Sequence, residues 1–452
     1  MSAAGPPAVD NEGARPPGEG GAERRIGWGH TVSAAGPRAV DNEGARPLGG
    51  GGAERRIGGP SVTDYDVAIA GAGLVGLSVA PALVRAGLSV ALIDRADVRM
   101  PDSPPAGEGW DTRMYAISPG SAAFLESIGA WRGLPADRIA AVETMRVEGD
   151  TGALLSFSAY ELGERALAWI VEERTLRAEL VRVAKAAGVA IHAPYALDAL
   201  TWTPDAGTLH CADGTALTAR LIIGADGLRS RVREAAGIAA VTRSYGQTAV
   251  VANFNCEHPH RGRAWQWFLD DGGVLAWLPL PGRRVSMVWS APDREARELL
   301  ALPAEELAAR VASCGRRALG TLESITPSAG FPLQLQKVPT MIAHRVALVG
   351  DAAHGVHPLA GQGVNLGFGD AEALAAVLRG RGPLTDPGAP LLLERFARRR
   401  AAPVLAMQTV TDTLARLFGA TSPWIRAARN FGMTVLDGLP PARRFLAHSA
   451  LR

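Results

Sequence analysis

Three glycines and one acidic residue stand at a spacing suited to binding a diphosphate. Gly71, Gly73 and Gly76 form a G-x-G-x-x-G pattern directly after the apolar stretch 67–70, and Asp94 follows the next apolar stretch, 90–93. Glycine permits a tight turn and a close backbone approach, and the N–H groups that begin the next helix attract phosphate. An acid about twenty residues further on can accept hydrogen bonds from a ribose. The pattern predicts a strand–helix–strand unit that binds a dinucleotide.

Two further polar segments follow apolar stretches. The stretch 221–224 leads into Asp226 and Gly227, although a simple strand-to-helix turn explains this segment equally well when it is taken alone. The stretch 345–350 leads into Asp351, which we expect at the carboxyl edge of a sheet, where doubly wound folds bind ligands. The glycine-rich loop that follows is expected to begin a helix at about Val364, whose N-terminus would stabilise negative charge on a ligand.

These segments must be positioned by an α/β fold. We expect a doubly wound, Rossmann-like nucleotide-binding domain assembled from residues 63–140, 170–240 and 340–385. A β-sheet domain, predicted over 141–169 and 241–339, interrupts it, and helices are expected over 386–452. Within this plan we predict helices at 119–128 and from about 173 to 187, and a hairpin at 143–159. Trp265, Trp267, Trp277 and Trp289 are expected mainly in the core of the inserted sheet.

The first 62 residues are predicted to form a disordered tail. Residues 2–27 and 33–58 are near-exact copies of one another, rich in glycine, proline, alanine and charge. Such a composition cannot bury enough apolar surface to offset the entropy of ordering. Two copies without hydrophobic periodicity also do not make a solenoid. The duplication, or a start site placed too far upstream, explains the tail without a specific function.

In this order, the three segments resemble the single-component flavin-dependent aromatic hydroxylases, a group that includes para-hydroxybenzoate hydroxylase. The resemblance covers residues 65–450 and rests on G-x-G-x-x-G, then G-A-D-G at 224–227, then G-D-A-A-H and P-x-x-G-Q-G within 350–363. Two stretches, D-T-R-M-Y-A-I-S at 111–118 and H-x-x-H-P-x-A-G-Q-G-x-N-L-G at 354–367, are similar to the ubiquinone-biosynthesis hydroxylases. Those enzymes act on polyprenylated phenols.

The resemblance implies that FAD is the cofactor and indicates which residues contact it. Its pyrophosphate would lie at Gly71, Gly73 and Gly76, and its adenosine ribose at Asp94. Its ribityl or ribose portion would lie at Asp351. The isoalloxazine ring would be lined by Gly361, Gln362, Gly363 and Asn365. Arg113 and, from a shorter match at 173–177, Arg174 correspond to arginines near the cofactor. Asp226 and Gly227 match a motif that contacts FAD and is linked with NAD(P)H use.

His357 and Pro358 are the candidate catalytic residues implied by the same loop. For His354 and His357 two interpretations stay open, because a histidine there can shape the flavin loop or transfer a proton. The resemblance implies that reduced flavin and O2 form a C4a-hydroperoxide, which a phenol attacks. The reductant is NAD(P)H or another electron donor, since the chain has a single G-x-G-x-x-G. No metal ligand set is expected.

Three other functions remain compatible with the sequence. A hydroxylase of a small soluble phenol in aromatic degradation would share the whole fold. A flavin-binding assembly subunit without turnover would share the cofactor segments. A flavin reductase of isoprenoid double bonds would share the first fingerprint. The lead interpretation is an FAD-dependent monooxygenase that hydroxylates the ring of a polyprenyl phenol or related quinone precursor.

Composition restricts the kinds of binding partner and the cellular compartment that we expect. A formal net charge of +2 provides no strong field for nucleic acid, and the three cysteines lack metal-ligand spacing, which fits a reduced cytoplasmic protein. The chain has neither a membrane-spanning apolar run nor an apolar leader. Arginines alternate with apolar residues over 391–452, so these helices either contact the inner face of a membrane or pack with a solvated basic face. Membership of a biosynthetic complex is a further expectation.

Overall fold

A computed structural model describes residues 63–98, 109–356, 363–419 and 423–439, together with residues 441 and 444. The chain divides into two units, Met1–Ile57 and Gly58–Arg452, and all described residues belong to the second. The predicted disordered tail therefore lies outside the described residues. Within the described part, no helix combines the length and the apolar character needed to cross a lipid bilayer.

The first large sheet has a parallel centre with the strand order β18-β19-β11-β1-β2-β8, and β10 and β9 extend it from β11. Its strands are β1 (Tyr65–Ala70), β2 (Val90–Ile93), β8 (Ala190–His192), β9 (Leu197–Trp202), β10 (Gly207–Cys211), β11 (Ala216–Gly224), β18 (Ile342–Ala343) and β19 (Val346–Leu348). The central strands are apolar because both faces are covered, as expected for parallel strands. The predicted α/β class is confirmed.

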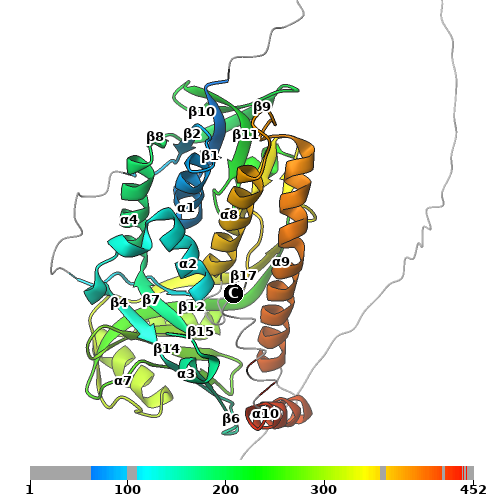
Figure 1. Ribbon diagram of the computed structural model, residues 1–452. Coiled ribbons are helices and arrows are strands. Elements are labelled where there is room, and N and C mark those ends of the chain that lie inside the picture. Colours follow the sequence, from blue (N-terminus) through cyan, green and yellow to red (C-terminus); the bar gives the residue numbers. More distant parts are fainter. Residues whose placement is uncertain are drawn as a thin grey trace, which may run out of the picture. The chain divides into compact units, whose positions relative to one another are not determined.

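Helices from distant parts of the chain pack on this sheet. Figure 1 shows α1 (Leu74–Val84), α8 (Gly363–Arg379) and α9 (Pro390–Gly419) alongside one another, and α4 (Glu173–Ala186) also contacts α1. The helix α2 (Pro119–Ile128) has the predicted bounds. Ser118 caps its N-terminus by accepting a hydrogen bond from the Ser121 N–H, and Gly129 ends it at φ +86°. The short helix α5 (Arg231–Ala235) follows β11.

The second large sheet is mainly antiparallel, with the strand order β16-β12-β15-β14-β13-β5-β6 and β17 paired to β12. Its strands are β5 (Thr144–Glu148), β6 (Leu154–Ser158), β12 (Val241–Cys256), β13 (Arg263–Phe268), β14 (Val274–Leu280), β15 (Arg284–Pro292), β16 (Leu322–Ser324) and β17 (Ala329–Lys337). The predicted hairpin is β5 and β6. The short helix α3 (Ala159–Leu162) follows it.

The tryptophans fill the core between this sheet and two helices that the sequence analysis did not predict. These are α6 (Asp293–Ala301) and α7 (Ala304–Cys314). Trp277 and Trp289 are almost fully buried and belong to one cluster with Leu299 and Val311 from these helices. The expectation that most of the tryptophans belong to the sheet core is therefore met by their packing.

A small third sheet connects segments that we assigned to different domains. It joins β3 (Met114–Ile117), β7 (Ala168–Glu172) and β4 (Ile139–Val142), with β7 in the middle. The short 3-10 turns η1 (Trp131–Gly133) and η2 (Ala136–Arg138) precede β4, and η3 (Gly350–Ala352) follows β19. The helix α10 (Pro423–Asp437) is the last described helix. The division into functional domains stays a prediction.

Candidate cofactor site

The carboxyl ends of three parallel strands bring the three polar segments together. In the sheet register Ala70 of β1 pairs with Gly224 of β11, which pairs with Leu348 of β19. Beyond these residues, the Ala225 N–H donates to the Ala70 carbonyl at 2.8 Å, and the Val349 N–H donates to the Gly224 carbonyl at 2.9 Å. The segments that begin at Gly71, Ala225 and Gly350 therefore leave the sheet side by side at one edge.

Each glycine of the fingerprint meets a different spatial requirement. Gly71 has φ +111°, and a Cβ there would lie 2.2 Å from the Ala225 carbonyl oxygen. A Cβ on Gly76 would lie 1.9 Å from the Gly71 carbonyl oxygen. A Cβ on Gly73 would meet no described atom within 4 Å. Two of the glycines are thus required by contacts within the chain, while Gly73 borders open space.

This open space suits the diphosphate of FAD. Gly73 is the N-cap of α1, and among the described residues no side chain caps that helix end. The first N–H groups of a helix lack partners within the helix and favour an anion. The fingerprint turn therefore fits a diphosphate by its free donors and by the room at Gly73.

Asp94 lies beside the same turn. Its Oδ2 accepts a hydrogen bond from the Ala72 N–H at 2.6 Å, and its Oδ1 accepts one from the Ala96 N–H at 2.7 Å. The carboxylate is half-buried. Since each carboxylate oxygen can accept more than one hydrogen bond, the fixed Asp94 retains capacity for a ribose hydroxyl.

Arg177 is a residue of this site that the sequence analysis missed. Its Nε donates to the Ala72 carbonyl oxygen at 3.3 Å, so α4 places a cation at the fingerprint turn. Arg177 stands one helical turn after Arg174, within the same matched stretch 173–177. The sequence offered no signal for Arg177 beyond its place in that stretch, because Arg174, three residues earlier, donates to Gly109 instead.

Close packing also joins the Asp351 turn to the fingerprint helix. A Cβ on Gly350, which has φ +60°, would lie 3.2 Å from Val75 Cγ2 of α1. A Cβ on Gly367 of α8 would lie 2.5 Å from the same atom. The turn η3 and the helices α1 and α8 therefore meet around Val75.

Asp351 is exposed at the surface, but the protein around its carboxyl group displaces much of the water that would otherwise hydrate that group. Burial of the group raises the pKa of Asp351, while the charges of His354 and Arg113 act in the opposite direction. Burial likewise raises the pKa of Tyr115 to about 12, with Glu173 and Asp351 adding to the effect and Arg113 opposing it. The charge of Arg113 thus acts to lower the pKa of both Asp351 and Tyr115.

A buried ionic network holds the Asp351 turn in place. Asp370 of α8 is fully buried, and its Oδ2 receives hydrogen bonds from His354 Nε2 at 2.6 Å and the Gly350 N–H at 2.9 Å. Its Oδ1 receives one from Arg400 Nε at 2.6 Å. Burial acts to raise the pKa of Asp370, but these partners together hold it below its usual range. His354 is therefore placed to support the loop.

The start of α8 is tied to β3 and α2 through Asn365. Its Nδ2 donates to the Ala116 carbonyl at 2.8 Å, and its Oδ1 accepts from the Ser118 N–H at 3.0 Å. Gly363 is the first residue of α8, one position before the expected start. The other predicted loop residues, His357, Pro358, Gly361 and Gln362, lie outside the described residues.

Asp226 is directed at the helix that follows it. Its Oδ2 accepts hydrogen bonds from the N–H groups of Arg231 at 2.7 Å and Val232 at 3.2 Å, and its Oδ1 accepts one from Ser230 Oγ. Burial raises the pKa of Asp226, and these hydrogen bonds oppose the shift. Gly227 has φ +80° with no described atom within 4 Å of a Cβ. The segment thus stabilises α5, and its contact with FAD stays a prediction.

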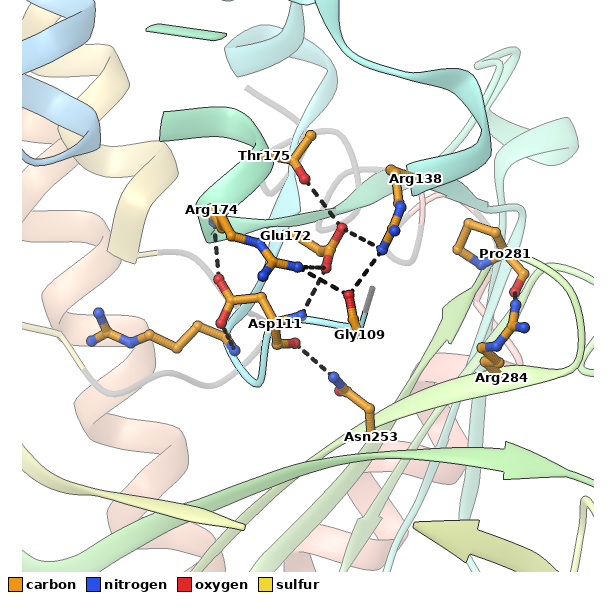
Figure 2. Close-up of polar contacts among 10 residues, drawn as sticks. Gly109, Asp111, Arg138, Glu172, Arg174, Thr175, Asn253, Pro281 and Arg284 are labelled. Atoms are coloured by element: carbon orange, nitrogen blue, oxygen red, sulfur yellow. Dashed lines mark hydrogen bonds and ion pairs between the residues drawn. The ribbon is translucent and has the colours of Figure 1, made fainter. Parts of the chain in front are cut away.

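The two predicted arginines occupy different places. Arg113 Nη1 pairs with Glu173 Oε2 at 2.8 Å, and its guanidinium lies 4.5 Å above the ring of Phe331 in β17. Arg174 instead donates from Nη2 to the Gly109 carbonyl at 3.0 Å, as Figure 2 shows. Arg113 therefore lies where β17 of the second sheet meets the start of α4, whereas Arg174 holds the backbone that leads to it.

Figure 2 shows how that backbone is fixed from several elements. Glu172 is almost fully buried and accepts hydrogen bonds from the Asp111 N–H at 2.7 Å and Thr175 Oγ1 at 3.1 Å. Arg138 approaches the same carboxylate at 3.3 Å. Asn253 of β12 donates from Nδ2 to the Asp111 carbonyl at 2.7 Å. The second sheet therefore helps to position the segment that carries Arg113.

The chain is similar to known proteins along most of its length. The model of a family described as FAD binding domain matches residues 64–411. The chain is 38% identical to the ubiquinone hydroxylase UbiL of Rhodospirillum rubrum, over 85% of this chain and 89% of that protein. It is 33% identical to the 3-demethoxyubiquinol 3-hydroxylase of Escherichia coli, over 82% of this chain and 94% of that protein. It is 32% identical to the human ubiquinone biosynthesis monooxygenase COQ6, over 84% of this chain and 91% of that protein.

Solved structures with the same fold are also known. The chain is similar to PqsL of Pseudomonas aeruginosa, described as a probable FAD-dependent monooxygenase, with 25% identity and a TM-score of 0.67 over 81% of this chain and 99% of that one. The p-nitrophenol 4-monooxygenase PnpA of Pseudomonas putida shares the fold at 20% identity and a TM-score of 0.69, over 86% and 98%.

Proposed function

We propose a specific function from one established premise: the chain belongs to the FAD-binding-domain family and is an FAD-dependent monooxygenase. It acts in ubiquinone biosynthesis and hydroxylates the aromatic ring of a polyprenylated phenol or a related quinone precursor. This proposal rests on the relatives that match more than four-fifths of the chain, because their names all refer to ubiquinone or its biosynthesis. We place the enzyme in the cytoplasm, at the inner face of the membrane.

The residues described above have defined roles in this proposal. The N–H groups at Gly73 and the start of α1 bind the FAD diphosphate, and Asp94 accepts a hydrogen bond from the adenosine ribose. Asp351 binds the ribityl portion, supported by the Asp370 network. The N-terminus of α8 would lie near the isoalloxazine ring, where its dipole would stabilise negative charge. Gly361, Gln362, Gly363 and Asn365 line that ring.

When bound and reduced, FAD supplies the activation of O2. The reaction converts an aromatic C–H to C–OH with one oxygen atom of O2. The other oxygen leaves as water, with two electrons from NAD(P)H or another donor and two protons, of which NAD(P)H carries one and solvent supplies the other. The chain orients the ring and excludes water, which would otherwise divert the oxidant. We retain Asp226 and Gly227 as contacts linked with reductant use, Arg113 and Arg174 as supports near the cofactor, and His357 and Pro358 as the catalytic candidates.

A single-turnover experiment tests this function. Purified FAD-loaded protein is reduced and then mixed with ¹⁸O₂ and a short-chain prenyl phenol, and the product is analysed by mass spectrometry. The proposal predicts one ¹⁸O atom in each hydroxylated ring. Hydroxylation of small phenols alone would favour aromatic degradation, and formation of hydrogen peroxide without a hydroxylated product with any phenol would contradict a catalytic role. Deletion of the gene in its host should lead to accumulation of a quinone intermediate that lacks one ring hydroxyl.

A further inference from the structure

The helix α10 exposes apolar side chains to solvent, although the protein holds it on the opposite side. Trp424 is 85% exposed, Phe431 72% and Val435 42%. On the opposite side, Arg429, Asn430 and Met433 are buried. A helix on a globular protein ordinarily turns its polar face to solvent, so an exposed apolar stripe on α10 is unusual.

The three exposed side chains form one stripe, which we call the α10 stripe (Trp424, Phe431 and Val435). Their separations of seven and four residues place them on the same helix face at 3.6 residues per turn. Ala427, also exposed, lies next to them. The 15 residues of α10 give the helix a length of about 22 Å.

Buried polar contacts fix this orientation. Asp150, in the turn between β5 and β6, forms an ion pair with Arg429 and accepts a hydrogen bond from Asn430 Nδ2 at 2.6 Å. Both charged side chains are almost completely buried, and separating them would leave a charge without its partner. Gly149 leaves room for this contact, because a Cβ there would lie 2.1 Å from Asn430 Oδ1.

A second anchor lies at the C-terminal end of α10. The Ser156 N–H of β6 donates to Asp437 Oδ1 at 3.0 Å. Figure 1 shows α10 next to β6, in agreement with these contacts. The helix is thus held at its middle and at its C-terminal end, and it cannot roll to bury the α10 stripe without breaking these contacts.

The region around the stripe is basic. Residues 413–452 contain six arginines, of which Arg429 pairs with Asp150, and one acidic residue, Asp437. Arg416, near the end of α9, is 65% exposed. Asp437 is engaged with β6, and Asp412 pairs with Arg416 and Arg243. This charge excess complements an anionic surface.

We propose that α10 lies on an anionic lipid bilayer, with the α10 stripe inserted at the boundary of headgroups and acyl chains. The proposal rests on the proposed function, because a polyprenylated substrate is dissolved in that bilayer. Aromatic residues on an apolar face with nearby arginines are typical of interfacial helices. A second copy of the chain fits less well. Two aromatic side chains offer about 150–250 Å² each, whereas a stable interface needs about 800 Å² per partner.

Vesicle sedimentation of the FAD-loaded full chain tests this surface. We expect the wild type to sediment with vesicles of phosphatidylcholine and phosphatidylglycerol, and less with phosphatidylcholine alone. The double variant Trp424→Ser, Phe431→Ser should bind the anionic vesicles at least about tenfold more weakly, because both side chains lose their burial in lipid. The matched control is Leu384→Ser, which removes another fully exposed apolar side chain. Leu384 precedes α9, whose 30 residues span about 45 Å before α10.

Each other outcome has a defined meaning. Equal vesicle binding by the double variant and the wild type, or no binding by the wild type, would overturn the proposal. So would a lipid-free dimer of the wild type that the double variant dissociates in sedimentation velocity. Because these side chains are exposed, the variants should keep their flavin content and unfolding temperature. Turnover of a water-soluble short-chain phenol separates the two proposals, since its absence with intact vesicle binding would contradict only the proposed function.

Discussion

The two large sheets of this protein place different demands on the amino-acid sequence. At the carboxyl edge of the first sheet, backbone lies against backbone, as where a Cβ on Gly71 would be 2.2 Å from the Ala225 carbonyl. In the second sheet, large side chains such as Trp277 and Trp289 pack against α6 and α7. Close backbone approach demands one residue type at one position, whereas core packing tolerates several apolar residues. The cofactor edge is therefore conspicuous in the sequence, and the second sheet is not.

The largest effect is expected where a buried charge supports the cofactor edge. Asp370→Asn removes the charge that pairs with His354 and Arg400, and should lower the free energy of unfolding by about 3–5 kcal/mol at neutral pH. FAD affinity should fall as well, because Asp370 holds the Gly350 N–H next to Asp351. Chemical denaturation and a flavin titration measure the two effects. A stability loss below 1 kcal/mol would contradict this role.

The same carboxyl predicts a pH dependence. The pKa of Asp370 is lower in the folded protein than its usual value, so its contribution is fully present above that value and is lost as the pH falls through the folded-state pKa. Acid denaturation should therefore separate wild type and Asp370→Asn most at neutral pH, and the difference should shrink below about pH 4.

A pair of identical substitutions tests the requirement for glycine at the cofactor edge. Gly76→Ala should destabilise the protein by about 3 kcal/mol, because its Cβ would lie 1.9 Å from the Gly71 carbonyl oxygen. Gly432 is also in a helix, but a Cβ there would meet no described atom within 4 Å. The substitution Gly432→Ala should therefore be neutral or stabilise the protein by up to about 1 kcal/mol. Thermal unfolding of both variants is the measurement. Equal losses of stability in the two variants would contradict the requirement for glycine at position 76.

A core substitution in the second sheet should separate stability from cofactor binding. Trp277→Leu leaves a cavity next to Gly315, whose Cβ position lies 2.2 Å from the indole, and should cost about 2 kcal/mol. FAD affinity should change less than about twofold, because Trp277 faces α6 and α7 rather than the edge of the first sheet. A flavin titration that shows a much larger change would mean that the two regions are coupled.

The smallest effect concerns Glu295 of α6, which packs on the second sheet, and its neighbour Asp271. Burial raises the pKa of Glu295 to about 7, with Asp271 adding to the shift and Arg310 opposing it. Between about pH 4.5 and 7 the folded protein therefore binds more protons than the unfolded chain, and the free energy of unfolding falls as the pH rises. Glu295→Gln should remove this slope, and because water screens the partly exposed carboxyl, the gain relative to wild type between pH 5 and pH 8 should be only about 1 kcal/mol. Parallel pH curves for the two proteins would contradict the assignment.

The sequence predicted the elements whose position depends on local signals. The helix α2 was predicted from Pro119 and Gly129, and the observed bounds are the predicted ones. The hairpin β5–β6 followed from alternation around 149–152. The convergence of the segments at Gly71, Asp226 and Asp351 followed from the rule that parallel strands present their carboxyl ends at one edge.

Other features depend on contacts between distant residues, which single-sequence patterns do not contain. The partners of Asp370, His354 and Arg400, are 16 and 30 residues away along the chain. Arg177 was passed over for Arg174, because the side-chain direction on α4 depends on how that helix packs on α1. The helices α6 and α7 were included in a β-rich region, since the tryptophans around them dominated the pattern.

Flavin titration of Gly73→Val against wild type tests most directly whether the three segments bind one FAD. A Cβ at Gly73 meets no described atom within 4 Å, so this variant should fold with an unchanged unfolding temperature. Its side chain would fill the space assigned to the diphosphate, and FAD affinity should fall at least about a hundredfold, or roughly 3 kcal/mol. Wild-type protein should bind one FAD and turn yellow. A Gly73→Val protein that keeps its full yellow complement, or a wild type that stays colourless with FAD, would contradict the account.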